Sequence, residues 1–457
     1  MGFFNTLELP SARTRPLHAF LPASISWLFA ASKPAQHDVS FDLTTSSSAF
    51  EVSILPPPRV SKPAALPLEV VLSIIEAAYF TDDLEVNEDL LRSCSLVCRS
   101  WSMVSQKLLF SQVTLRTQRA FELFSTAVDR STERGCALGD SVIRLRVVLD
   151  HNQPFTLHQH SFALAVMMCP NLYELNLALY GCAAPGEDIV GVPAISRMRR
   201  PAPSFDDHTL ALLKAGPTIT ALQFSNWSEN DQSIFQLLDV WPSLKSLIIS
   251  GTPPQLPSPS SAPFSCELDE LRMNFQTPPS VDFMKWLLHN STSLRVLEFE
   301  REPSAHLLEY LVDTHGASLH SLSIPAVTAD ACLALHKCKQ LREVAIQSCT
   351  TSPAVYKKLP EVLEHVAVGV DSDTQLIPLI YLVKSKNALK AVTVHLRDGA
   401  TAHKELAVLK VACAYRGVEL RMVRDVQVFR KLVRGDPISV EAYPRPKSLD
   451  NLHIMRS

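Results

Sequence analysis

Glycine is scarce in this sequence, with only 13 among 457 residues. Loops that cradle phosphate groups need several closely spaced glycines, and the sequence contains no such loop. The G-x-S-x-G turn of serine hydrolases and the H-E-x-x-H helix of zinc proteases are also missing. A chain of this length without a catalytic constellation is expected to bind other molecules rather than to act as an enzyme.

Three further shortages narrow the class of protein. The 43 Lys and Arg residues nearly balance the 46 Asp and Glu residues, so no basic field favours nucleic acid as a partner. No apolar run reaches the roughly 18 residues that a membrane helix requires, so no membrane partner is expected. The ten cysteines are scattered, unlike those of small secreted scaffolds. Reduced thiols in a cytoplasmic or nuclear protein are expected, with no cofactor and no metal.

Residues 1–65 are expected to form a disordered leader and linker. Their second half is rich in serine and proline, in runs such as TTSSS and ILPPPRVSKPAA, and shows no helical or strand period. The MGFFNT start and the apolar stretch at 20–31 fit myristoylation and signal-peptide patterns poorly, because Phe3 is bulky and Pro22 interrupts the apolar run. Regular structure is expected to begin at Leu66.

Short amphipathic helices are predicted between residues 66 and 115. The first has an apolar stripe at helical spacing, formed by Val70, Val71, Ile74, Ile75 and Ala78. After a polar break, Asn87 is expected to cap a second helical segment. The stripe of that segment is Leu90, Cys94, Val97 and Trp101, with Cys98 beside it, and another short helix ends near Phe110. No histidine or second cysteine pair lies near Cys94 and Cys98, so packing is expected rather than metal binding.

From about Val142 the sequence repeats a loose L-x-x-L-x-L pattern of apolar residues. Its copies are Leu172-Leu175-Leu177, Ile219-Leu222-Phe224, Leu244-Leu247-Ile249, Leu268-Leu271-Met273, Leu294-Leu297-Phe299, Leu319-Leu322-Ile324, Leu341-Val344-Ile346, Leu363-Val366-Val368 and Leu389-Val392-Val394. Val142-Leu145-Val147 is predicted to open the series, and Tyr415-Val418-Leu420 is a frayed last copy. Amphipathic helical stretches precede most copies. From residue 219 the copies are 22 to 26 residues apart, which predicts stacked helix–strand units.

The predicted fold class is therefore α/β. A helical segment at 66–115 is followed by a solenoid at 116–430 and a polar tail at 431–457. Two inserted loops are expected to interrupt the solenoid, at 181–204 and 251–264, and the second is rich in proline and serine.

Two other groups of residues are weak candidates for chemistry. The triplet GDS that ends at Ser141 is shared with one family of lipases and esterases. In that family the serine lies at a strand-to-helix turn, whereas a strand pattern follows Ser141 directly. Cys332, His336 and Cys338 have a spacing that suits a metal site, but they belong to a repeat helix, and packing is expected.

The segment from Leu66 to about Leu115 resembles the F-box family. LPLEVVLSI is similar to the opening L-P-x-E-L-L-x-x-I of that family. CSLVCRSW is similar to its second signature, V-C-[KR]-x-W, and KLLFSQVTL resembles the usual close. The link TDDLEVNE is longer than the compact form of the family. With the repeats that follow, the whole chain resembles fungal F-box proteins with C-terminal degenerate leucine-rich repeats.

This resemblance implies a substrate-recognition subunit of an SCF-type cullin–RING ubiquitin ligase. The F-box would dock on the adaptor subunit, and the repeat horseshoe would hold a protein substrate near the transfer site. The implied adaptor-binding residues are Leu66, Pro67, Glu69, Val70, Ile74, Val97, Cys98, Arg99 and Trp101. Cys94 and Val97 are also expected to pack within the helical unit. Two alternatives stay open: a repeat scaffold outside any ligase, and a serine hydrolase that uses Ser141.

In such a horseshoe, the residues that flank the second and third apolar positions line the concave face. They are Glu174, Asn176, Gln223, Ser246, Glu270, Arg272, Val296, Glu298, Glu300, Ser321, Ser323, Glu343, Thr393 and His395. The residues expected to contact substrate are Glu270, Arg272, Glu298, Glu300 and Glu343. An acidic functional face would favour a partner segment rich in Lys or Arg, and an ordinary solvated face is the alternative.

Overall fold

The protein is described by a computed structural model, which divides into two units, Met1–Ala64 and Ala65–Ser457. The structure describes residues 67–434 apart from 80–85, 182–201, 229, 257–262, 327–330, 332–334, 348–355, 357–358 and 398–402. The predicted leader and linker, Leu66, most of the first inserted loop, the middle of the second, and the tail beyond residue 434 lie outside the described residues.

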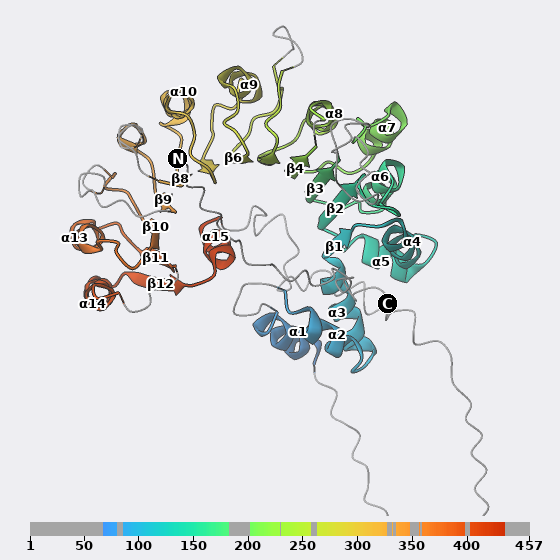
Figure 1. Ribbon diagram of the computed structural model, residues 1–457. Helices are drawn as coiled ribbons and strands as arrows, with labels where there is room; N and C mark the ends of the chain where they lie inside the picture. Colours follow the sequence, from blue (N-terminus) through green and yellow to red (C-terminus); the bar gives the residue numbers. More distant parts are fainter. Residues whose placement is uncertain are drawn as a thin grey trace, which may run out of the picture. The chain divides into compact units, whose positions relative to one another are not determined.

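Within the described part of the chain, one open sheet contains twelve parallel strands, and each strand pairs with its neighbours in the sequence. The strands are β1 (Gln112–Leu115), β2 (Arg144–Asp150), β3 (Glu174–Tyr180), β4 (Ala221–Trp227), β5 (Ser246–Gly251), β6 (Glu270–Phe275), β7 (Val296–Phe299), β8 (Ser321–Ile324), β9 (Glu343–Ile346), β10 (His365–Val370), β11 (Ala391–Leu396) and β12 (Glu419–Val423). The sheet is curved, as Figure 1 shows. This α/β arrangement is solenoid-like and agrees with the stacked units that the period of the repeats predicted.

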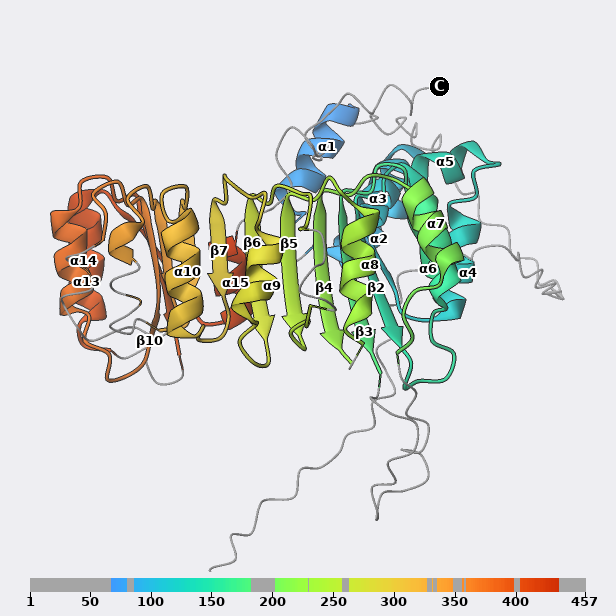
Figure 2. The same ribbon diagram turned by 90° about the horizontal axis from the view of Figure 1, so that it is seen from above.

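Helices cross from strand to strand along the convex side of the sheet (Figures 1 and 2). They are α4 (Gln118–Ala127), α5 (Glu133–Gly139), α6 (Gln159–Met167), α7 (Asp207–Ala215), α8 (Gln232–Val240), α9 (Val281–Leu287), α10 (Ala305–His315), α13 (Ile377–Ser385) and α14 (Leu406–Arg416). Several begin after a polar residue whose side chain accepts a backbone N–H three residues on, as Asp206, Ser280 and Ser304 do. These caps let the local sequence decide where each helix starts.

The repeated apolar triplets form the core between the sheet and the convex helices. Leu294, Leu297 and Phe299 are at most 3% exposed. Leu297 lies in register between Leu271 on β6 and Leu322 on β8. The predicted periodicity therefore corresponds to a continuous stack of buried side chains along the solenoid.

The predicted register is confirmed at the start of the series and wrong at its end. Leu145 pairs with Leu175, as the opening copy requires. At the other end Leu420 pairs with Val392, so it takes the second position of its triplet and not the third. Tyr415 is 89% exposed in α14, which continues to Arg416 because Gly417, at a φ of 66°, supplies the left-handed C-cap. β1 is a further strand, which the repeat pattern did not predict.

Helices α1 (Leu68–Ala77), α2 (Glu88–Ser95) and α3 (Arg99–Phe110) precede the sheet. Their shared core consists of Val71, Ile75, Tyr79, Leu91, Cys94 and Val104. The predicted stripe of α1 is divided, because Val71 and Ile75 are buried whereas Val70 and Ile74 are exposed. Asn87 caps α2 as predicted, since its side chain accepts the Leu90 N–H at 3.1 Å.

The predicted stripe from Leu90 to Trp101 spans two helices instead of one. α2 ends at Ser95, Cys98 has extended backbone angles, and α3 begins at the next residue. The break ends the helical periodicity that would have kept Val97 on the buried face. Val97 is 62% exposed, so the expectation that it packs within the helical unit is wrong.

Acid should destabilise the solenoid partly through His315, which is buried at the end of α10. Burial lowers the pKa of this histidine below its usual value of 6.5. Below pH 6.5 this histidine is protonated in the unfolded chain but stays neutral in the folded chain. Its contribution to stability is therefore fully present above pH 6.5 and is lost as the pH falls toward the folded pKa. His315→Leu should reduce the loss of the urea midpoint between pH 7.5 and pH 5.5. The exposed control His289→Leu should not; equal effects would contradict this assignment.

Candidate interaction surfaces

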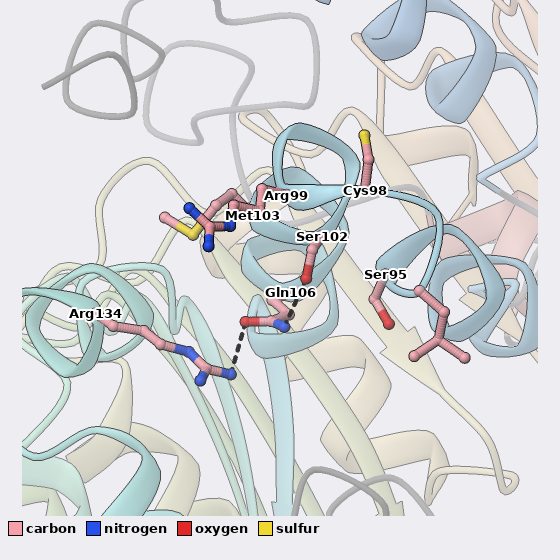
Figure 3. Close-up of a pocket in the computed structure, with 8 residues that line it drawn as sticks. Ser95, Cys98, Arg99, Ser102, Met103, Gln106 and Arg134 are labelled. Atoms are coloured by element: carbon pink, nitrogen blue, oxygen red, sulfur yellow. Dashed lines mark hydrogen bonds between the residues drawn. The ribbon is translucent and has the colours of Figure 1, made fainter. Parts of the chain in front are cut away.

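The turn between α2 and α3 borders an open hollow of about 520 Å³ (Figure 3). Its lining residues are Ser95, Leu96, Cys98, Arg99, Ser102, Met103, Gln106 and Arg134. Leu96 is 75% exposed, and with Val97 it forms an apolar pair at the surface of the turn. Large apolar side chains exposed together are typical of protein contact sites.

The base of this hollow is fixed by a chain of hydrogen bonds. Arg134 on α5 donates to the Gln106 side chain at 2.9 Å, and Gln106 donates to the Ser102 hydroxyl at 3.0 Å (Figure 3). These bonds join α3 to a helix of the solenoid. Nothing in the sequence indicated Arg134, since no short-range pattern links residues 28 positions apart. Leu96 was also missed, although it directly precedes the V-C-R-x-W signature.

The two cysteines of this region have different environments. Cys94 is buried in the helical core, and burial raises the pKa of its thiol. Cys98 is exposed, and its hydrogen bond with the Ser100 hydroxyl at 3.1 Å lowers the pKa of its thiol. Cys94 packs as predicted. Within the ranges that the structure describes, no three His, Cys, Asp or Glu side chains are grouped to hold a metal ion.

The residues expected to bind an adaptor differ in their accessibility. Pro67, Val70, Ile74, Val97, Cys98 and Arg99 are exposed. Trp101 is half-buried and packs against the core of the helical unit, so only part of its ring is available to a partner. Leu66 and the side chain of Glu69 lie outside the described residues.

The parallel register places the predicted concave residues in rows across the strands. One row contains Arg272, Glu298, Ser323, Ala345 and Ala367, from β6 to β10. These residues alternate along their strands with the buried triplets, so they point to the opposite face from the convex helices. The sheet therefore gathers side chains that lie up to about a hundred positions apart in the sequence.

The charged residues of this face are paired with one another. The Arg272 guanidinium lies 3.5 Å from a Glu270 oxygen and 3.7 Å from a Glu298 oxygen. Arg272 and Glu298 are each 4% exposed. An ordinary solvated face was the alternative interpretation, and it does not fit these two side chains because both are almost completely buried. Salt screens such a buried ion pair only weakly.

The two other acidic residues expected to contact substrate also have partners. Glu300 accepts a hydrogen bond from the Asn274 side chain at 2.6 Å. A Glu343 oxygen lies 3.7 Å from His365 Nδ1, and His365 also contacts the Thr393 hydroxyl at 2.9 Å. These acidic side chains are thus held in defined positions by contacts with neighbouring strands.

An unpredicted helix lies on the concave side of the sheet. This helix, α15 (Val426–Arg434), follows β12 and sits within the curve of the sheet (Figure 1). Asp425 caps it, since its carboxylate accepts the Val428 N–H at 3.4 Å. The predicted boundary at residue 430 falls inside this helix. The spacing of Val426, Phe429 and Val433 was the signal that could have identified it.

The remaining candidates for chemistry have structural partners. The Ser141 hydroxyl donates to the Ala137 carbonyl at 2.6 Å, at a turn that leads from α5 into β2. A strand-to-helix turn, which the lipase-like motif requires, is therefore not present at Ser141. Cys338 is buried, which raises the pKa of its thiol to about 11, while His336 is exposed and Cys332 lies outside the described residues.

Comparison with models of known protein families finds no match, and comparison with curated proteins finds none either. In the part of the chain that the structure describes, no helix combines the length and the apolar character needed to span a bilayer.

Proposed function

We propose that the chain is the substrate-recognition subunit of an SCF-type cullin–RING ubiquitin ligase, with an N-terminal F-box and a leucine-rich-repeat horseshoe. The observation that carries this proposal is the exposed turn at Leu96, Val97 and Cys98 on a packed three-helix unit. The V-C-R-x-W signature lies at that turn, and Pro67 of the L-P signature directly precedes α1. A fold by itself does not assign this role, and these exposed residues are what supports it.

In this proposal the helical unit and the concave face of the sheet have different partners. The helical unit offers exposed apolar side chains to an adaptor, and the curved sheet offers accessible acidic side chains such as Glu343 to a substrate. The chain then performs no bond chemistry; it raises the effective concentration of a substrate lysine at the transfer site.

Recovery of the adaptor with tagged full-length chain from a fungal host tests this function. Wild-type chain should recover both adaptor and cullin. Leu66→Ala with Pro67→Ala should lower adaptor recovery by on the order of tenfold or more, since truncated interface anchors cost about 2 kcal/mol or more. Val70→Glu with Ile74→Glu should do the same, because both side chains are exposed on α1 and leave the core unchanged.

Tyr415→Ala, at an exposed site of the solenoid, is the matched control and should recover adaptor normally. Undiminished recovery by both double variants would overturn the docking site. Adaptor without cullin, or neither, would instead favour the repeat scaffold that acts outside a ligase.

A further inference from the structure

The concave face has a seat of small side chains on β9 and β10. Ala345 and Ala367 are in register on these strands, in the row where β6 and β7 carry Arg272 and Glu298. A methyl group at each position leaves space above the sheet that long side chains would fill. The seat can therefore accept a large apolar group from outside the sheet.

Helix α15 places Phe429 in this seat. Phe429 is buried and forms one core cluster with Ala345 and Ala367, and Val433 packs against the same cluster. Its ring centroid lies 5.4 Å from that of His395 on β11, with the ring planes inclined by 30°. The Phe429 ring thus packs on two alanine methyl groups and beside the His395 imidazole.

The residue after Phe429 supplies a charged contact to a different strand. An Arg430 nitrogen lies 3.3 Å from a Glu300 oxygen, directly after β7. Both side chains are partly shielded from solvent, so salt screens this pair less than a surface pair. Phe429 and Arg430 together span the face from β11 to β7, and Figures 1 and 2 place α15 on the opposite side of the sheet from α9 and α10.

We propose that the concave face between β7 and β11 is a binding groove for an amphipathic helix in which a basic residue follows an aromatic one. Helix α15 occupies this groove in cis until a partner helix of the same chemistry displaces it. Helix α15 defines the chemistry of that partner, because Phe429 fits against the two alanines and Arg430 pairs with Glu300. Recognition of a helix through spaced anchors on one face is a common mode of peptide binding. The inference depends only on the contacts of α15 and not on membership of a ligase.

The covalent connection of α15 to β12 determines how strongly α15 competes with a free partner helix for the groove. A segment joined directly to β12 acts at an effective concentration of about millimolar for its own groove. The apparent affinity for a free helix is then reduced by the fraction of molecules whose groove is open. A variant with a weakened α15 should bind an external copy of the helix more tightly than the wild-type chain does.

A fluorescent peptide with the sequence Arg424–Asp436, RDVQVFRKLVRGD, tests this proposal by anisotropy titration against the full-length chain. Phe429→Ala in the chain should tighten peptide binding at least tenfold relative to wild type. A peptide with alanine in place of its phenylalanine should not bind measurably. Adding Ala367→Leu to the Phe429→Ala chain fills the seat and should abolish binding.

Arg430→Glu serves as a second variant, because it sets two carboxylates against each other without removing the apolar anchor. It should also tighten peptide binding, and higher salt should weaken binding of the unmodified peptide. If neither variant binds the peptide more tightly than wild type while both unfold at the wild-type urea midpoint, the groove does not exist. Binding that persists in the Ala367→Leu chain would place the site elsewhere. Adaptor recovery should be the same for all these chains, so the outcome is separable from the ligase proposal.

Discussion

Leu297→Ala should lower the free energy of unfolding by about 2–5 kcal/mol, the usual cost of truncating a buried leucine. Leu297 is fully buried and lies in register between Leu271 and Leu322, so the cavity would open in the middle of the stack. Each repeat is buried by the repeats on either side of it, so the stack cannot rearrange to close the cavity. Urea unfolding followed by circular dichroism measures the loss.

The matched control is Val296→Ala on the same strand. Val296 is only half-buried and points to the opposite face of the sheet from Leu297. Its truncation should cost much less than that of Leu297. Equal destabilisation of the two variants would contradict the assigned register.

Arg272→Ala should cost about 3–5 kcal/mol, the range observed when one partner of a buried ion pair is removed. Glu298 is then left in a nearly dry environment without the guanidinium, and Glu270 loses the same neighbour. Urea unfolding at pH 7 measures this loss.

Two comparisons separate the ion pair from simple side-chain truncation. Arg301→Ala removes an arginine whose side chain is exposed next to β7, and it should be almost neutral. Arg272→Met with Glu298→Leu replaces both charges by apolar groups and should recover most of the stability. If Arg272→Ala is as mild as Arg301→Ala, the pair does not contribute to folding.

The burial of this pair also decides which acidic residue is suited to a binding experiment. Charge reversal at Glu298 would disturb folding along with recognition. Glu343 is half-buried on β9 and contacts His365. Glu343→Lys is therefore the cleaner test of an acidic contact with a substrate.

The repeat architecture could be predicted because its signals are local and numerous. Each triplet, such as Leu244-Leu247-Ile249, places apolar side chains on one face of a short strand. N-cap residues such as Asp206 and Ser304 are local signals of the same kind, because each bonds to a backbone N–H only three residues ahead. The last copy was misplaced because Tyr415 and Val418 have triplet spacing by chance, and one of them belongs to a helix.

The candidate sites were less predictable. The residues of the L-P and V-C-R-x-W signatures were identified from the sequence, but the direction of each side chain was not. Whether Val97 faces the core or solvent depends on where α2 ends, and the apolar spacing continues unchanged across that end. Periodicity alone cannot detect a helix break that leaves the spacing intact.

The sequence by itself determined the α/β repeat, the buried triplets, the cap of α2 at Asn87, and which residues carry charge on the concave face. Tertiary structure alone decided how those charges are paired, how Arg134 holds α3, and where α15 lies. The physical reason is distance along the chain. Arg430 meets Glu300 across 130 positions, and the seat for Phe429 exists only because two alanines on separate strands fall in register. No local preference encodes such a contact; it forms when the stacked repeats bring remote side chains together.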